Sequence, residues 1–259
     1  QVPILSVRPR WGIMLVEVRS AGCECHGASD DLTCDVEEFH AASPVPLLDE
    51  LPDPDRSAAD RFLTSISDAT QWEQLGVRDQ AVVFGHRSRK LPQHSFGKTT
   101  AHNISWPKVM ELFSSAERFL EARNEALSST QGILRLLEIV DDIRFDVQML
   151  VSSPVPMMST REFIGRASMV RRACGEFLVV IAPTAANRVS SSTVIRGELE
   201  VCGMRFVPKG TSVDVYVMAE SDPSGENGTF PRWVYQYGDW ATGDAAGALR
   251  RYLETHCSL

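Results

Sequence analysis

The sequence has no apolar run of about 18 residues, so no segment is expected to cross a membrane as a helix. It is also poor in basic residues, with 26 Lys and Arg against 34 Asp and Glu. Nucleic-acid-binding proteins usually carry a basic stripe, and none is visible, so we expect no nucleic-acid partner. No signal peptide is recognisable. We therefore expect a cytoplasmic protein, with peripheral membrane association left open.

The cysteines also exclude several classes of site. Six are present, but their spacing is not that of a disulfide framework, and a reduced protein is the simpler interpretation. Cys23, Cys25 and Cys34 lie near His26 and could hold Zn²⁺, yet the spacing matches no standard zinc finger. No nucleophile with an adjacent base is recognisable. We predict no metal site, no cofactor and no catalytic residue.

The chain divides near residue 56. Residues 1–56 are punctuated by Gly, Asp and Pro, which predicts an N-terminal extension that is poorly ordered or contributes one docked strand, at residues 11–18. A protein partner could bind through this extension. Residues 57–259 are predicted to form one domain, large enough to bury a core.

Hydrophobic spacing predicts the elements of this domain. A helix begins at Ser57 as N-cap, and further helices follow Pro107 and cover residues 123–127. Strand patterns occupy residues 82–84 and 99–104, and residues 133–140 and 143–151 form a hairpin. Further strands are expected at residues 162–171, 177–182, 194–201, 204–207 and 212–219, before a helix at 231–257. Consecutive strands with segregated helices indicate an α+β fold.

Four segments carry a family resemblance: TREFI at 160–164, VIRGE at 194–198, DPSGENGTFPRW at 222–233 and LRRYLE at 249–254. Their order and spacing resemble those of the START (StAR-related lipid transfer) domain family, over about residues 60–255. The resemblance implies a helix-grip fold, a curved antiparallel β-sheet wrapped around a long C-terminal helix with an internal lipid tunnel. It further implies that one phospholipid, sterol or ceramide is bound there and transferred between membranes or sensed.

The sequence departs from the family at informative places. Asn124 and Glu125 stand where family members usually carry Trp-Asp. The cavity charge pair of the sterol-binding members corresponds here to Ala167 and Gln148, so both charges are missing together. Arg166 is one residue away, and in a regular strand it points to the opposite face, unless a bulge turns it inward.

Tunnel residues are expected on the strands and on the last helix, while ordinary surface or core positions remain the alternative for each. The candidates for lipid contact are Gln148, Arg166, Ala167, Met169, Arg196, Tyr216, Met218, Trp233, Tyr237 and Leu249. Trp240 and Val189 are the candidates for membrane contact. Gly238, Gly243 and Gly247 would weaken the last helix, which suggests a lid.

A lipid-binding protein without catalysis is the favoured interpretation, with a lipid ligand and transient contact with a membrane surface. Two alternatives stay open. One is an enzyme on a helix-grip scaffold, such as a cyclase or ester hydrolase. The other is a lipid-gated protein-interaction module.

Overall fold

The computed structural model describes residues 45–88, 93–127, 132–151, 159–184, 194–224 and 232–259, the side chains of 232–237 excepted. The predicted strand at residues 11–18 lies outside this part. The described helices are η1 (Leu48–Glu50), α2 (Asp53–Ser67), η2 (Ala69–Gln71), α3 (Trp106–Leu112), α4 (Ala116–Leu127) and α5 (Arg232–His256). The strands are β1 (Trp72–Arg78), β2 (Ala81–His86), β3 (Gln93–His102), β4 (Ile133–Ile139), β5 (Arg144–Val151), β6 (Arg161–Arg171), β7 (Phe177–Pro183), β8 (Ile195–Arg196), β9 (Glu198–Lys209) and β10 (Ser212–Asp222).

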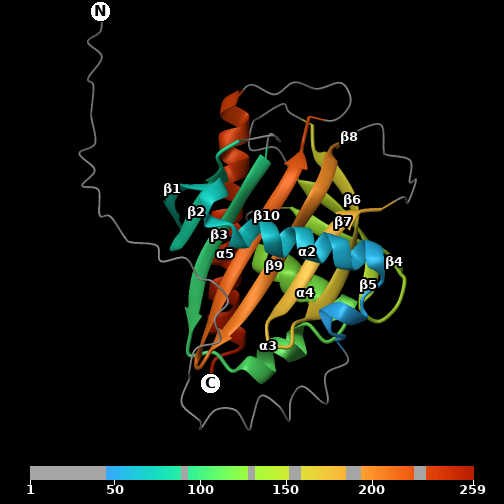
Figure 1. The fold of residues 1–259 in the computed structure, drawn as a ribbon, viewed down its shortest axis with the longest axis vertical. Coiled ribbons are helices and arrows are strands. Elements are labelled where there is room, and N and C mark those ends of the chain that lie inside the picture. Colours follow the sequence, from blue (N-terminus) through green and yellow to red (C-terminus); the bar gives the residue numbers. More distant parts are fainter. Residues whose placement is uncertain (1–44, 89–92, 128–131, 152–158, 185–193, 225–231) are drawn as a thin grey trace, which may run out of the picture.

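The strands form one sheet in the order β1-β2-β3-β10-β9-β7-β6-β5-β4, with antiparallel neighbours throughout. The short β8 pairs in parallel with the start of β6. The helices α3 and α4 carry the chain from β3 to the far edge at β4, and this crossover leaves β3 free to pair with the last strand (Figure 1). The predicted α+β fold, an antiparallel sheet with a long C-terminal helix, is confirmed.

The two faces of the sheet carry different helices. On the inner face, α5 packs against β1, β2, β3 and β10, and α4 packs against β4 and α5. On the outer face, α2 lies across β7 and β9 (Figure 1). Side chains alternate between the faces. Val215 and Val217 of β10 therefore join the inner core, whereas Met218 joins the cluster under α2.

Glycines allow α5 to approach the sheet closely. A Cβ added at Gly243 would lie 2.4 Å from Val83, and one at Gly247 would lie 2.5 Å from the carbonyl oxygen of Asp79. The turn at Asp79 has a positive φ of 50°, and Arg251 of α5 forms an ion pair with its side chain. The α5 glycines thus have a packing role that the lid hypothesis did not anticipate.

Several predicted boundaries were wrong. The helix expected from Ser57 begins at Asp53, because Pro54 suits a first helical turn that needs no N–H donor there. Residues 198–209 form one strand rather than two. The strand at 72–78 was not predicted. The hairpin at 133–151 is confirmed. Val45 and Leu51, within the predicted extension, are buried in the domain, and the boundary at residue 56 stays a prediction.

Candidate functional site

The inner face between α5 and α4 is an apolar surface. Its central strands contribute alternate, buried side chains: Phe145 and Val147 of β5, Phe163, Ala167 and Met169 of β6, Phe177, Val179 and Ile181 of β7, and Cys202, Met204 and Phe206 of β9. Phe113, which directly follows α3, packs against this surface, and its ring stacks on Phe177 with centroids 5.0 Å apart. This surface can hold an apolar group, but only a polar side chain there could orient one.

Arg123 is such a side chain, and the sequence analysis missed it. It lies on α4 between Phe119 and Leu127 on the apolar face of the helix, and only 3% of it is exposed. Its Nη1 donates to Gly132 O at 2.8 Å and to Asn124 Oδ1 at 3.1 Å, both uncharged acceptors. The available signal was an arginine at helical spacing from Phe119 and Leu127.

No carboxylate among the described residues pairs with Arg123. Burial lowers the pKa of Arg123 to about 10, so the guanidinium still carries its charge at neutral pH. The group that interacts electrostatically with Arg123 is the thiol of Cys202 on β9, but burial raises the pKa of Cys202 to about 12, so this thiol brings no negative charge at neutral pH. A buried cation without a counter-charge costs several kcal/mol. The arrangement therefore suits an anionic group brought in by a ligand.

The buried thiols do not suit nucleophilic chemistry. Burial raises the pKa of Cys257 to about 11, as it raises that of Cys202, so both are protonated near neutral pH. A thiolate is the reactive form. The fold leaves these two cysteines as small apolar residues of the core.

Three predicted tunnel residues lie together on the inner side. Ala167 and Met169 of β6 are completely buried in the inner core, and Leu249 joins them from α5. These positions are apolar, so they can define the shape of a ligand site but not its polarity.

Gln148 and Arg166 lie on the outer face instead. Strand β6 pairs with β5 without a bulge, with Arg166 opposite Asp146 and Gln148 opposite Ile164. The alternative in which Arg166 turns inward is therefore wrong. Gln148 cannot face Ala167 either, since their side chains project from opposite faces of the sheet.

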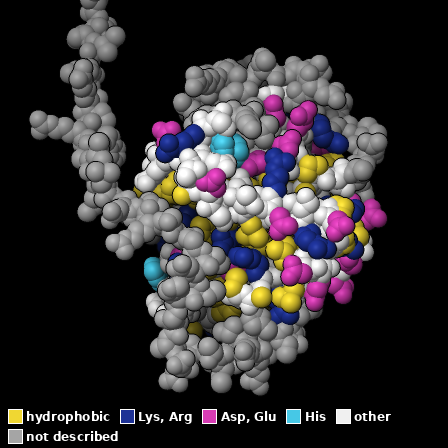
Figure 2. All heavy atoms as spheres, viewed as in Figure 1, with side chains coloured by type: hydrophobic (Ala, Val, Ile, Leu, Met, Phe, Trp, Pro, Cys, Tyr) yellow, Lys and Arg dark blue, Asp and Glu magenta, His cyan; other side chains and the backbone are white. Residues whose placement is uncertain are grey.

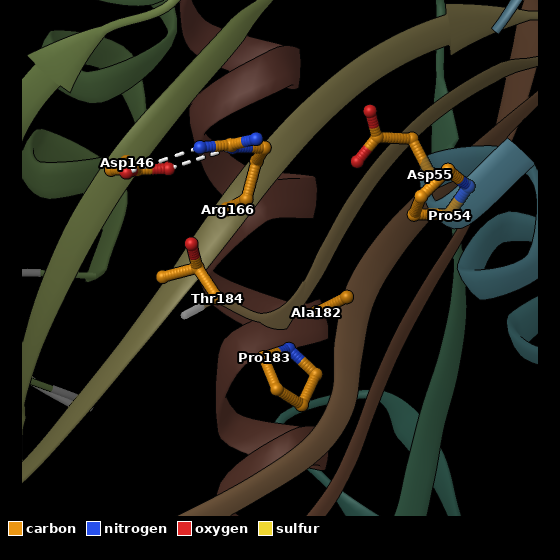
Figure 3. A pocket seen from close by; sticks show the side chains of 7 residues that line it. All are labelled: Pro54, Asp55, Asp146, Arg166, Ala182, Pro183 and Thr184. Carbon is orange, nitrogen blue, oxygen red and sulfur yellow. Dashed lines mark hydrogen bonds and ion pairs between the residues drawn. The ribbon is translucent and has the colours of Figure 1, made fainter. Parts of the chain in front are cut away.

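Arg166 lines an outer pocket of about 340 Å³ at the N-terminus of α2 (Figure 3). Its Nε donates to Asp146 Oδ1 at 2.8 Å, and the Asp146 side chain is almost completely buried. Asp55, on the opposite wall, is paired with Arg144 at 3.3 Å. These charges neutralise one another, so the pocket offers no free charge to a ligand.

Arg196 has a structural partner. Its Nη2 donates to Glu162 Oε2 at 2.8 Å, and Gln148 donates to Oε1 of the same buried carboxylate. The neighbouring Arg161 donates to the carbonyl oxygen of Pro223, the residue that follows β10, at 2.8 Å. The TREFI segment thus fastens β8 and the end of β10 to β6.

The other candidates divide as follows. Tyr216 and Met218 belong to the outer face. Trp240 is half-buried and lies against Gly76 of β1, where an added Cβ would be 2.9 Å from its ring. Val189 and the side chains of Trp233 and Tyr237 lie outside the described residues.

Over the described ranges, no three His, Cys, Asp or Glu side chains are grouped closely enough to hold a metal ion. In the same ranges, no helix combines the length and apolarity needed to span a bilayer.

The fold matches solved structures at low sequence identity. Human StAR-related lipid transfer protein 5 aligns with a TM-score of 0.64 and 14% identity, covering 77% of this chain and 94% of that one. Human STARD10 gives 0.61 and 13%, covering 79% and 80%. A STAR-related lipid transfer protein fragment from Xanthomonas axonopodis gives 0.56 and 17%, covering 71% and 98%.

No protein-family model and no curated protein sequence matches the chain. The resemblance first suggested by the TREFI, VIRGE and LRRYLE segments is nevertheless confirmed at the level of structure. The described part of the chain has the helix-grip fold of the START (StAR-related lipid transfer) domains.

Proposed function

We propose that this domain binds a single lipid between the inner face of the sheet and α5, and that Arg123 recognises an acidic group of that lipid. The observation that carries the proposal is the buried guanidinium, which has only uncharged acceptors among the described residues. A phosphate or carboxylate would supply the missing charge. A phospholipid or fatty acid therefore fits better than an uncharged sterol.

The apolar surroundings supply the affinity. Each methylene of an acyl chain that leaves water contributes about 0.8 kcal/mol. Leu199, Cys202, Met204 and Val217 of the inner face keep 6–8% of their surface exposed, which supports an accessible interior. Ala167, Met169 and Leu249 would shape the site, and Trp233 and Tyr237 remain proposed wall residues.

Binding rather than catalysis is supported by the raised pKa of the two buried thiols and by the fold that the chain shares with proteins named as lipid transfer proteins. We propose transfer between membranes or lipid sensing as the role, with transient membrane contact through Trp240 and Val189.

Native mass spectrometry of the purified protein tests the proposal. We expect one co-purified lipid per chain, carrying a phosphate or carboxylate. Arg123→Gln should weaken the binding of that lipid about 10- to 100-fold, which corresponds to the loss of one charged hydrogen bond. Arg118→Gln is the matched control, because Arg118 lies on the same helix but is exposed and pairs with Glu111. An unchanged ligand in Arg123→Gln would refute the role of Arg123, and an ester turned over by an empty protein would refute the whole proposal.

A further inference from the structure

A patch of basic residues lies on the outer face of the sheet, away from the proposed lipid site. Lys98, Tyr216 and Arg205 lie directly opposite one another on β3, β10 and β9. The Tyr216 ring is 5.1 Å from Lys98 Nζ and 5.3 Å from the Arg205 guanidinium. With Lys209 they form what we call the basic patch. Figure 2 shows this face, with dark blue side chains directly below α2.

The two lysines share one carboxylate. Lys209 Nζ is 2.7 Å and Lys98 Nζ 3.8 Å from Asp214 Oδ2. The lysine side chains are 59% and 40% exposed, whereas that of Asp214 is only 4% exposed. The positive groups therefore meet the solvent while their counter-charge lies beneath them.

Arg205 and Arg172 form a second pair of cations that shares one buried carboxylate, that of Glu176. Arg205 binds this carboxylate at 2.7 Å, and Arg172 binds it at 2.8 Å. The Glu176 side chain is buried, and burial alone would raise its pKa, but the two guanidinium groups hold that pKa below its usual value. Four cations thus face two buried carboxylates, in a chain whose net charge is −8.

The chain contains a segment of opposite charge near this patch. Residues 30–38 carry five carboxylates, and no Lys or Arg occurs between Arg19 and Arg56. The five are Asp30, Asp31, Asp35, Glu37 and Glu38.

The attachment point of this segment is within reach of the patch. Leu47 forms a bridge beside Arg171 at the end of β6, in a row that continues through Phe177 of β7 to Phe206 of β9. With about 4.8 Å between strands, Leu47 is about 14 Å from β9 and about 19 Å from β10. The seven Cα-to-Cα steps from Glu38 to Val45 can span up to about 23 Å.

We propose that the acidic segment, residues 30–38, docks on the basic patch of its own chain. Tethering makes the encounter intramolecular, at an effective concentration in the millimolar range, so modest ion pairs suffice. Because the lysines are exposed, the contact should weaken with salt.

Lysine acetylation, followed by mass spectrometry of the full chain, tests this directly. The chain has only four lysines, at positions 90, 98, 108 and 209. Lys108 on α3 is the internal control, because it binds Ser258 O at the C-terminus. The natural sequence is compared with a neutralised protein, a variant that carries D30N, D31N, D35N, E37Q and E38Q together. These substitutions leave every described residue unchanged.

We expect Lys98 and Lys209 to react severalfold faster in the neutralised protein than in the natural sequence, with Lys108 equal in both. High salt, about 0.5 M, should remove the difference by screening. Equal rates at low salt would overturn the proposal. Protection that grows with protein concentration would overturn it in favour of a second copy. Protection that appears only with phosphatidylserine vesicles, equally in both proteins, would overturn it in favour of a membrane surface.

Discussion

Gly97 of β3 and Thr242 of α5 are so close that a Cβ on Gly97 would lie 2.4 Å from the Thr242 carbonyl oxygen. Ser95 on the same strand meets the Thr242 hydroxyl at 3.4 Å. The backbones of helix and strand therefore touch without an intervening side chain. Any movement of α5 away from β3 would have to break this contact.

The α5 glycines can be tested as a matched pair. Gly243→Ala should destabilise the fold by about 2 kcal/mol, because its methyl group would clash with Val83 and cores tolerate little overpacking. Gly238→Ala meets nothing closer than 3.4 Å and should be neutral or stabilising, by up to about 1 kcal/mol of helix propensity. Urea unfolding measures both. If Gly243→Ala were as harmless as Gly238→Ala, α5 would be the loosely held lid.

Glu220 should make stability depend on pH in the acid range. Burial would raise its pKa, but the His94 imidazole, whose Nε2 is 2.7 Å away, a hydrogen bond from Ser65 and the charge of Arg61 lower it to about 2, from an ordinary value of 4.5. A carboxyl whose pKa falls on folding stabilises the fold above its unfolded pKa. That contribution is lost as pH drops from about 4.5 to about 2.

Unfolding followed by circular dichroism from pH 6 to pH 2 checks this. Glu220→Gln should reduce the drop in the free energy of unfolding between pH 6 and pH 2 by on the order of 2 kcal/mol. The exposed Glu111 offers a control, since Glu111→Gln should leave the profile unchanged. Identical profiles for the Glu220 variant and the natural sequence would show that Glu220 gains nothing from folding.

Arg123→Met should leave the lipid-free protein as stable as before, or more stable. The change removes a buried cation whose desolvation is not offset by a counter-charge, and apolar replacements of buried charges are often neutral or stabilising by about 1–4 kcal/mol. Denaturant unfolding of delipidated protein measures it. A loss of several kcal/mol would mean that the bonds to Gly132 and Asn124 make Arg123 structural.

Ala167→Phe asks whether the inner core has room. If the inner face lines a ligand site, the larger side chain should occupy that space, abolish lipid co-purification and cost less than about 1 kcal/mol. Ala59 is equally buried but lies in the cluster under α2, so Ala59→Phe should cost about 1–3 kcal/mol or more by overpacking. Equal losses in melting temperature would argue that the interior is filled by side chains.

The sequence was sufficient for the α+β class, because strand alternation and helical spacing are local patterns, and the motif segments carried the resemblance that implied the helix grip. It was poorer at assigning faces. Gln148 was paired with Ala167 by counting residues from a family motif, yet counting gives no cross-strand register. The register places Gln148 opposite Ile164 on the outer face, where its side chain donates a hydrogen bond to Glu162.

Charge patches were harder still to predict. In the basic patch, Arg205 and Tyr216 belong to the consecutive strands β9 and β10, but Lys98 is distant in sequence and becomes their neighbour only because β3 pairs with β10. A linear search for basic stripes cannot find such a surface. Arg123 was overlooked for a different reason, since one arginine on an apolar helical face resembles a long side chain whose charged end reaches solvent.

Asn124, which replaces a usual family residue, has a consequence for the behaviour of the protein at high concentration. Its amide accepts from Leu134 N at 2.9 Å and donates to Leu134 O at 2.7 Å, as a neighbouring strand would. Strand β4 ends the described sheet order, and exposed edge strands are templates for aggregation. The Asn124 side chain from α4 thus occupies the N–H and C=O of Leu134, which an incoming strand would otherwise pair with. Asn124→Ala should therefore make the protein prone to self-assembly through β4.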